Sequence, residues 1–343
     1  MPGRDISFTT FNLFNFNLPG RRMYTGAGWT DAQYAAKLDF TRRMVERMEA
    51  DVFGLQELWS AAALDEMLQG TRLAATHRTV TPPDHDGRGI VCAALVRPGI
   101  LADAPRWITG FPDELVLTSA GDDPQQPDMA VNLRSFSRPV LHLRVQVRDD
   151  APVIEVFVCH LKSRRPTRID GEPWFDRDVH GPHATAIGYA LSTVRRTAEA
   201  AALRVVITKI AKGTDNPVVV LGDLNDGKAS NTLNVLSEQP TYLAGLSTGG
   251  RDNALYTAQV LQEYRSTRDV YYTHVYQKER ESLDHILFSQ EFYDNSRRRK
   301  WKFDEMIVAN DHLNFDDHKD TGTTDHGIVR VGFRWSEARQ EMA

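Results

Sequence analysis

The sequence has only two cysteines, Cys92 and Cys159, among its 343 residues. Each lies in a strand-like run, so we expect buried thiols in a reducing compartment rather than a disulfide. Long apolar segments are also missing, because the longest purely apolar run, Ile90–Val96, is far shorter than the ~20 residues of a membrane span. The first residues, MPGRDISFTTFNLF, lack the basic, apolar and small-residue pattern of a signal peptide. These absences predict a soluble, cytoplasmic protein without a membrane span.

An excess of basic residues is absent too. The chain has 41 Lys and Arg against 46 Asp and Glu, a formal net charge of −5, which by itself does not favour a polyanionic partner. Its 41% hydrophobic and 25% charged residues are typical of a globular protein rather than a disordered one. At roughly 150 residues per domain the length corresponds to about two domains. We nevertheless predict one domain, residues 1–343, because no linker or repeat divides the chain and the candidate site residues span nearly all of it.

Segments rich in β-branched and aromatic residues alternate with segments of helical periodicity. We expect strands at Ile6–Asn12, Val52–Leu55, Gly89–Val96, Pro139–Val147, Val153–Cys159, Val218–Leu221, Asp284–Phe288 and Gly327–Arg334, and helices at Ala35–Met48, Ala61–Leu68 and Ala184–Lys212. This mixture predicts an α/β domain with its sheets layered between helices.

Short polar clusters lie at the ends of these expected strands. They are Asn12 in TTFNLFNF, Gln56-Glu57 in VFGLQEL, His160-Leu161-Lys162 in VFVCHLKS, Asp223-Leu224-Asn225 in VVVLGDLND, Asp284-His285 in SLDHILF and Asp325-His326 in TTDHGIV. Each cluster alone is more typical of a turn, a helix cap or a core histidine. Their joint occurrence at strand ends, where a sheet fixes the backbone while the side chain meets solvent, indicates a functional site.

The residue types in these clusters suit hydrolysis of a phosphoester. Glu57, Asp325 and the Asn12 amide are hard oxygen ligands of the kind that Mg²⁺ prefers, with Mn²⁺ as an alternative. A metal held there would polarise a phosphoryl oxygen and neutralise the leaving oxyanion.

The remaining polar residues suit the proton transfers of the same reaction. Asp223 is expected to accept the proton of the attacking water, and Asn225, two residues on, to hold that water by its amide. A carboxylate beside His326 would favour the imidazolium form, which donates to a phosphoryl oxygen.

A basic run adjoins the third cluster. Lys162 follows His160 by two residues on the same face of a continuing strand, and Arg164 lies in the sequence KSRRPTR. Such runs are usually solvated surface, but the position of this one predicts contact of Lys162 and Arg164 with a substrate phosphate.

The order N, (Q)E, H, GDxN, D and (S/T)DH resembles that of the endonuclease/exonuclease/phosphatase superfamily, from Phe8 to about Arg334. GDLND and TDH are the most specific matches, although Gly follows TDH where many relatives have an apolar residue and Pro. The resemblance implies a four-layered α/β sandwich of two facing mixed sheets with outer helices and a site at one edge. It further implies that Asp284 is the carboxylate beside His326 and that His160 is a second phosphate-contacting histidine.

We therefore predict a Mg²⁺-dependent phosphodiesterase, in particular a nuclease with DNA as its substrate and no obligate protein partner. The first alternative is a phosphatase or phosphodiesterase acting on a small-molecule or lipid-headgroup phosphoester. The second alternative, a non-catalytic binding module, is disfavoured because the polar set is intact.

Overall fold

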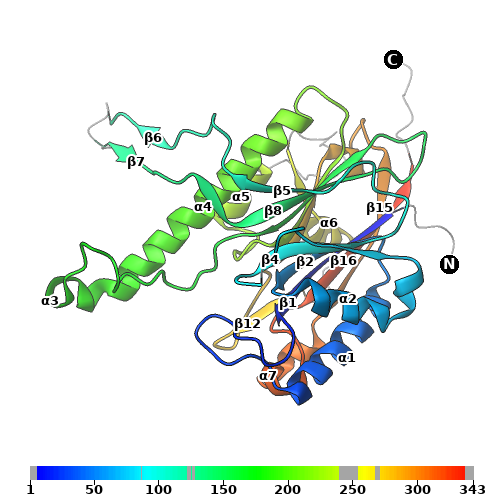
Figure 1. Cartoon of the computed structure of the whole chain (residues 1–343). Coiled ribbons are helices and arrows are strands. Elements are labelled where there is room, and N and C mark those ends of the chain that lie inside the picture. The colour runs from blue at the N-terminus through cyan, green and yellow to red at the C-terminus, as the bar shows by residue number, and fades with distance from the viewer. Residues whose placement is uncertain are drawn as a thin grey trace.

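A computed structural model describes residues 6–85, 87–121, 125, 128–238, 254–266 and 271–336. In these residues two six-stranded sheets face each other, and helices cover the outer side of each sheet (Figure 1). Both sheets contain parallel and antiparallel pairs. The expected four-layered α/β sandwich is therefore confirmed.

Sheet 1 has the strand order β15-β16-β1-β2-β4-β3. Its strands are β1 (Ile6–Phe16), β2 (Val52–Leu58), β3 (Arg78–Val80), β4 (Val91–Val96), β15 (Trp301–Ala309) and β16 (Ile328–Trp335). β1 runs parallel to β2 and antiparallel to β16. This pairing brings the first and last expected strands of the chain side by side.

Sheet 2 has the strand order β11-β14-β10-β9-β8-β5. Its strands are β5 (Arg106–Gly110), β8 (Ser135–Val145), β9 (Ile154–His160), β10 (Val218–Asp223), β11 (Tyr256–Thr257) and β14 (Asp284–Phe288). Two short hairpins complete the strands: β6 (Thr118–Ser119) with β7 (Met129–Ala130), and β12 (His274–Tyr276) with β13 (Glu279–Glu281). β10 at the centre pairs in parallel with β9 and antiparallel with β14.

The helices form the outer layers. They are α1 (Asp31–Met48), α2 (Ala61–Gln69), α3 (Arg177–His180), α4 (Ala184–Ala211), α5 (Asn231–Ser237), α6 (Ala258–Arg265) and α7 (His318–Thr321), with 3₁₀ turns at Arg72–Ala75, Gly181–His183, Gln290–Phe292 and Asp311–Asn314. α1 and α2 pack on sheet 1, whereas α4 and α5 pack on sheet 2. α1 begins with a capping box between Thr30 and Gln33, which satisfies backbone N–H groups at its first turn. α3 and the first part of α4 project beyond the sheets (Figure 1).

The central core lies between the two sheets and is built from the alternate apolar residues of both. The sheets approach closely at Gly54 of β2, where a Cβ atom would lie 1.9 Å from Leu221 Cδ1 and 2.9 Å from Val158 Cγ1. A larger residue there would push sheet 1 away from sheet 2. Because the site described below takes residues from both sheets, this contact also sets the distance between its two halves.

The expected elements are all present, with ends that differ by a few residues. The sequence did not predict the strands β3, β5, β11 and β15 or the helices α5 and α6. The longest of the missed strands, β15, directly follows the basic residues Arg297–Lys300 and contains Lys302, Asp304 and Glu305. A bulge between Phe303 and Glu305 further interrupts its alternation of buried and exposed residues. Cys92 and Cys159 are both buried and free, as expected.

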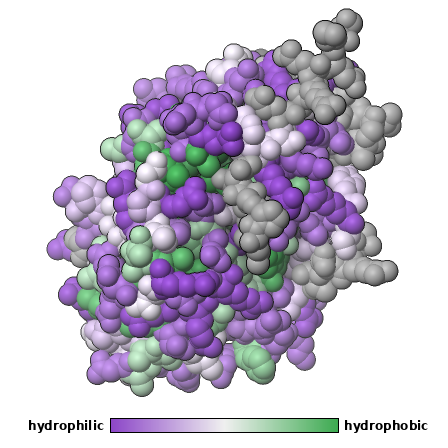
Figure 2. All heavy atoms as spheres, turned by 90° about the vertical axis from the view of Figure 1, so that its right-hand side faces the viewer, coloured by the Kyte–Doolittle hydropathy of each residue, from purple (hydrophilic) through white to green (hydrophobic). Residues whose placement is uncertain are grey.

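The face seen in Figure 2 is mostly hydrophilic, and its apolar side chains form small, separate groups. Among the described residues, no helix combines the length and the apolar character that crossing a membrane requires.

Candidate active site

The polar residues at the strand ends meet at one edge of the sandwich. In sheet 2, Asp223 at the end of β10 lies between His160 of β9 and Asp284 of β14. In sheet 1, Asn12 of β1 pairs with Gln56, next to Glu57. The Thr324 hydroxyl donates to the Asn12 carbonyl at 2.8 Å and so holds the 325–326 segment beside β1.

A cavity of about 620 Å³ opens at this edge. Its lining includes Glu57, His160, Asp223, Asn225, Asp325 and His326. The structure thus brings together side chains from four segments of the chain that the sequence indicated separately. Asn12 and Asp284 lie behind this lining and contact it through hydrogen bonds.

The backbone bends unusually at the site. Phe14, Asn15, Glu57 and Asn225 all have positive φ angles, between 52° and 61°, a conformation that costs energy for residues other than glycine. Hydrogen bonds compensate: the Asn15 N–H donates to Glu57 Oε2 at 3.0 Å, and the Asn225 N–H donates to Asp223 Oδ1 at 2.8 Å. These turns direct both carboxylates toward the cavity.

Asp223 is surrounded by nitrogen groups. The Asn12 amide donates to its Oδ2 atom at 3.1 Å, and the Nε2 atoms of His160 and His326 lie 3.4 and 3.7 Å from the same oxygen. Burial is the main reason why the pKa of Asp223 is raised, to about 6, against the opposing effects of His326 and of these hydrogen bonds. Asp223 is thus ionised at neutral pH, with a pKa close enough to neutrality for a general base.

The two histidines differ in charge. Burial alone would lower the pKa of His326, but Asp284, whose Oδ2 lies 2.8 Å from Nδ1, and Asp223 outweigh burial and hold that pKa well above the ordinary value. Burial, with smaller contributions from Arg138 and His326, holds the pKa of His160 well below the ordinary value. These opposite pKa shifts favour the imidazolium form of His326 and the neutral form of His160.

Glu57 and Asp325 form the acidic part of the cavity. Burial raises the pKa of Glu57, and the charge of Asp325 raises it further. Within the described residues the Asp325 carboxylate has neither a hydrogen-bond nor an ion-pair partner. Two neighbouring carboxylates with so little compensation fit a divalent cation with hard oxygen ligands.

Asn12, expected as a metal ligand, lies behind the cavity lining, and its role at a metal stays a prediction. Its Nδ2 donates to Asp223 and, at 3.4 Å, to Glu57, whereas its Oδ1 accepts from the Phe14 N–H. In this arrangement the Asn12 side chain links the Glu57 and Asp223 carboxylates.

Lys162 and Arg164 do not line the cavity. Lys162 Nζ contacts the carbonyl oxygens of Ser163 and Arg165, and Arg164 forms ion pairs with Asp226 and Glu281. These ion pairs form because the β12–β13 hairpin and the segment after β10 fold against residue 164, which the sequence alone did not indicate.

Arg138, Arg165 and Tyr24 line the cavity instead. Arg138 was overlooked because the expected strand began at Pro139, whereas β8 begins at Ser135. No residue pattern marked Arg138, because β8 also contains Ser135, Ser137, His142 and Arg144. Tyr24 lies in the loop between β1 and α1, where no residue pattern marked a role.

Lys37 of α1 is a further charged group near the site. It is fully buried, with Nζ 5.0 Å from the ring centroids of both Phe14 and Trp29. Burial lowers the pKa of Lys37 to about 7, although the charges of Asp325 and Glu57 oppose this effect.

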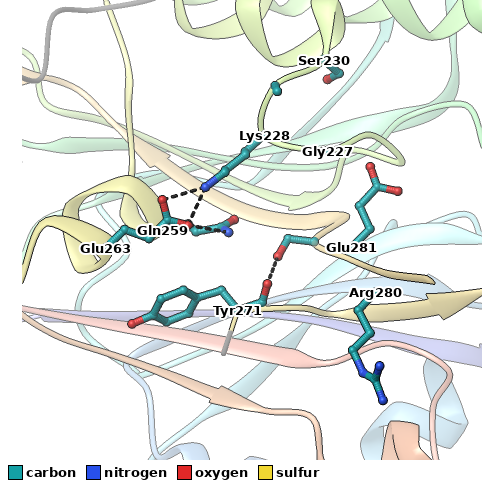
Figure 3. Close-up of a pocket in the computed structure, with 10 residues that line it drawn as sticks. Gly227, Lys228, Ser230, Gln259, Glu263, Tyr271, Arg280 and Glu281 are labelled. Carbon is teal, nitrogen blue, oxygen red and sulfur yellow. Dashed lines mark hydrogen bonds and ion pairs between the residues drawn. The ribbon is translucent and has the colours of Figure 1, made fainter. Parts of the chain in front are cut away.

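A second, larger cavity of about 830 Å³ lies beside Arg280 and Glu281. Lys228 points into it but is held by Glu263 at 2.7 Å (Figure 3). None of the residues gathered around Asp223 lines this cavity, so we assign the chemistry to the smaller one.

Comparison with known proteins agrees with the geometry. A family model described as the Endonuclease/Exonuclease/phosphatase family matches residues 9–326. The chain belongs to this family. The family name covers both nucleases and phosphatases, so membership indicates hydrolysis of phosphoester bonds and leaves the substrate open. A search of curated proteins finds no match.

Solved structures of the family share the fold. An endonuclease/exonuclease/phosphatase from Bacteroides vulgatus has a TM-score of 0.55 and 13% identity, covering 96% of this chain and 99% of its own. A mannosyl-6-phosphatase from Bacteroides thetaiotaomicron has a TM-score of 0.54 and 13% identity, covering 96% and 100%. D. rerio TDP2 complexed with a single-strand DNA product has a TM-score of 0.53 and 16% identity, covering 96% and 98%.

Proposed function

We propose that the protein is a Mg²⁺-dependent phosphodiesterase that hydrolyses DNA, with residues 1–343 acting as one domain. The observation that carries the nucleic-acid part is the pair of guanidinium groups, Arg138 and Arg165, on the wall of the cavity that contains Asp223. Among the described residues neither guanidinium is paired with a carboxylate. A polynucleotide has phosphates on both sides of the one that is cleaved, so it offers a partner to each.

The aromatic ring of Tyr24 supports the same substrate. Tyr24 is 62% exposed and packs edge-on against Trp59 at the cavity, with ring centroids 5.0 Å apart. An exposed ring beside cationic groups is a surface on which a nucleobase stacks.

The residues around Asp223 have the properties that in-line hydrolysis requires. Asp223 accepts the proton of the attacking water, and Asn225 contributes its Oδ1 to hold that water, because its Nδ2 already donates to the Leu161 carbonyl. The His326 imidazolium donates to a phosphoryl oxygen, and neutral His160 provides a second contact. Glu57 and Asp325 would hold the Mg²⁺ ion. The bound ion would neutralise the charge that develops on the phosphoryl group and on the leaving oxygen.

A substrate panel tests the proposal. We expect the protein to cleave single- or double-stranded DNA with Mg²⁺, to stop when EDTA is added, and to turn over a phosphodiester such as bis-p-nitrophenyl phosphate better than the monoester. Turnover of monoesters or sugar phosphates alone, with no cleavage of DNA, would instead support the phosphatase alternative. Cleavage that persists under full chelation would exclude the metal-dependent mechanism.

Variants of the arginines test the substrate more directly. Arg138→Gln and Arg165→Gln should each weaken DNA binding roughly tenfold and lower the slope of log Kd against log salt by about one phosphate contact. Arg168→Gln is the matched control, because Arg168 belongs to the same basic run but is exposed and paired with Asp170. Equal effects of all three variants would assign binding to general surface charge rather than to the cavity.

A further inference from the structure

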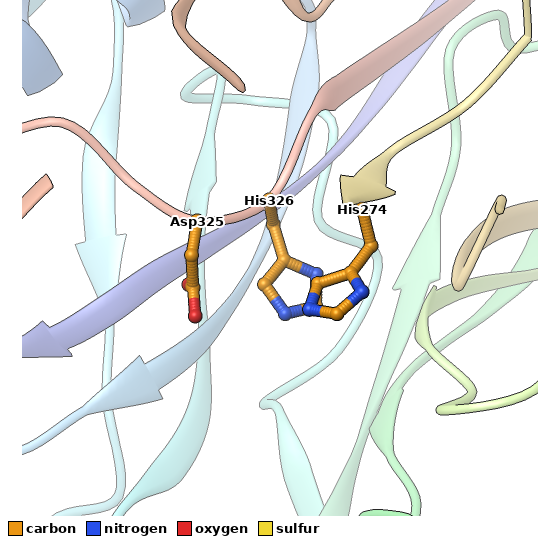
Figure 4. Close-up of side chains that lie close together, drawn as sticks. All are labelled: His274, Asp325 and His326. Atoms are coloured by element: carbon orange, nitrogen blue, oxygen red, sulfur yellow. The ribbon is translucent and has the colours of Figure 1, made fainter. Parts of the chain in front are cut away.

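His274 has no part in the proposed mechanism, yet it lies against the site. It is the first residue of β12, is half-buried and forms a β-bridge with His326. The ring centroids of the two histidines are 5.3 Å apart and the rings are tilted by 47°; Figure 4 shows them overlapping in the view, with Asp325 beside His326.

The backbone around His274 is firmly held. The Gly327 N–H donates to the Thr273 carbonyl at 2.6 Å. The Thr273 hydroxyl accepts from the N–H groups of Leu283 and Asp284 at 2.9 and 3.1 Å. These hydrogen bonds fix the backbone at His274 relative to both Asp284 and the segment that contains Asp325 and His326.

His274, Asp325 and His326 each present one ligand atom, and these atoms all lie within 4.8 Å of one another. Within the described residues no hydrogen bond or ion pair joins Asp325 to either ring. Metal–nitrogen and metal–oxygen bonds of about 2.0–2.2 Å place the ligand atoms of one ion roughly 3–4 Å apart. Small rotations of the three side chains would therefore close them around a shared cation.

The donor set differs from that of the Mg²⁺ site. Two imidazoles and one carboxylate favour a borderline cation such as Zn²⁺ over Mg²⁺, which prefers oxygen. Asp284, 2.8 Å from His326 Nδ1, is the kind of outer carboxylate that orients a ligating histidine and increases its basicity.

We propose that His274, Asp325 and His326 form a second cation site, which binds Zn²⁺ or a similar transition-metal ion and thereby inhibits the enzyme. The inhibitory part rests on the proposed function, because the ion would take Asp325 from Mg²⁺ and His326 from the phosphoryl group. The proton on His326 is released to solvent when the ion binds, since a ligating imidazole must be unprotonated.

Direct binding tests the site independently of activity. Protein freed of metal by chelation is titrated with Co²⁺, followed by visible absorption, and with Zn²⁺, followed by calorimetry. The wild type should bind one Zn²⁺ per chain, and His274→Gln and His274→Phe should each bind it roughly 100-fold more weakly. His183→Gln is the matched control and should bind Zn²⁺ as the wild type does, because His183 is an exposed histidine in a turn outside the cavity.

Zn²⁺ titration of the Mg²⁺-supported reaction tests the inhibition. His274→Gln and His274→Phe should keep the Mg²⁺-supported rate while the Zn²⁺ concentration for half-inhibition rises by the same factor as the Zn²⁺ dissociation constant. The proposed site is wrong if both His274 variants bind Zn²⁺ as tightly as the wild type does. It is also wrong if the wild type does not bind Zn²⁺. If the protein binds Zn²⁺ through His274 but shows no phosphodiesterase activity, the cation site is supported and the proposed function is rejected.

Discussion

The two sheets provide opposite halves of the candidate site. Sheet 1 presents Glu57, and the segment leading into its strand β16 presents Asp325, an acidic pair with few hydrogen-bond donors around it. Sheet 2 presents Asp223 among N–H donors and imidazoles, with His160 at its side. His326 belongs to the sheet 1 half by sequence but is bonded to Asp284 of sheet 2.

This difference shows how one residue type takes two roles. A carboxylate that lies near another one and that, like Asp325, has no hydrogen-bond or ion-pair partner among the described residues is best compensated by a cation. A carboxylate that, like Asp223, has a pKa near neutrality and two imidazoles beside it is suited to proton transfer. The environment that each sheet creates therefore matters more than the residue type, and variants in the two halves should differ in what they impair.

The largest effect is expected for Asp223→Asn. Loss of the base should lower kcat for DNA cleavage roughly 10²- to 10⁴-fold, because general base catalysis contributes that much. Mg²⁺ affinity, measured by calorimetry, should stay near the wild-type value. If Asp223→Asn weakens Mg²⁺ binding as much as a change at Glu57 does, the two halves do not have separate roles.

A smaller effect is expected for Glu57→Gln. Removal of one of two carboxylates should weaken Mg²⁺ binding by about 10- to 100-fold, while saturating Mg²⁺ restores much of the rate. The activity measured as a function of Mg²⁺ concentration checks this expectation. If kcat falls strongly while the dependence of the rate on Mg²⁺ concentration is unchanged, Glu57 acts in proton transfer rather than in metal binding.

The smallest effect is expected for Asp284→Asn and concerns pH. The Asp284 charge raises the pKa values of both His326 and Asp223, so its removal lowers both. The reaction needs Asp223 ionised and His326 protonated, so both limbs of the pH profile of kcat/KM should move to lower pH, by about one to two units. Asp226→Asn serves as the control, because Asp226 is held by Arg164 and Arg196 away from His326. If the alkaline limb of the pH profile does not move, His326 is not the protonated group that the reaction requires.

Much of the fold was accessible from the sequence. Strands such as Val218–Leu221 and helices such as Ala184–Lys212 follow from local periodicity, and both are present with nearly the same ends. β15 was not accessible, because its charges and its bulge hide the alternation. Its pairing with β16 comes from tertiary contacts that local patterns do not contain.

The candidate site was only partly accessible. GDLND and TDH marked Asp223, Asn225, Asp325 and His326, whose catalytic and metal-binding roles stay predictions. Arg138 and His274 carried no motif, because a side chain that reaches a site from the middle of a strand or the start of a hairpin leaves no pattern in its neighbours. The ion pairs of Arg164 with Asp226 and Glu281 join residues up to 117 positions apart.

The sequence by itself determined the main strands and helices, the α/β class and the identity of the polar residues at strand ends, since each depends on periodicity and on residue type. The four-layered sandwich followed from the resemblance of the motifs to a known family. Only the tertiary structure decided which of these residues share a cavity, which basic side chains are already in ion pairs and which carboxylate has a pKa near neutrality. Those properties depend on burial and on distances between segments, which only the packing of the two sheets establishes. The −5 net charge likewise says little about the partner, because Arg138 and Arg165 lie with the acidic residues in one cavity.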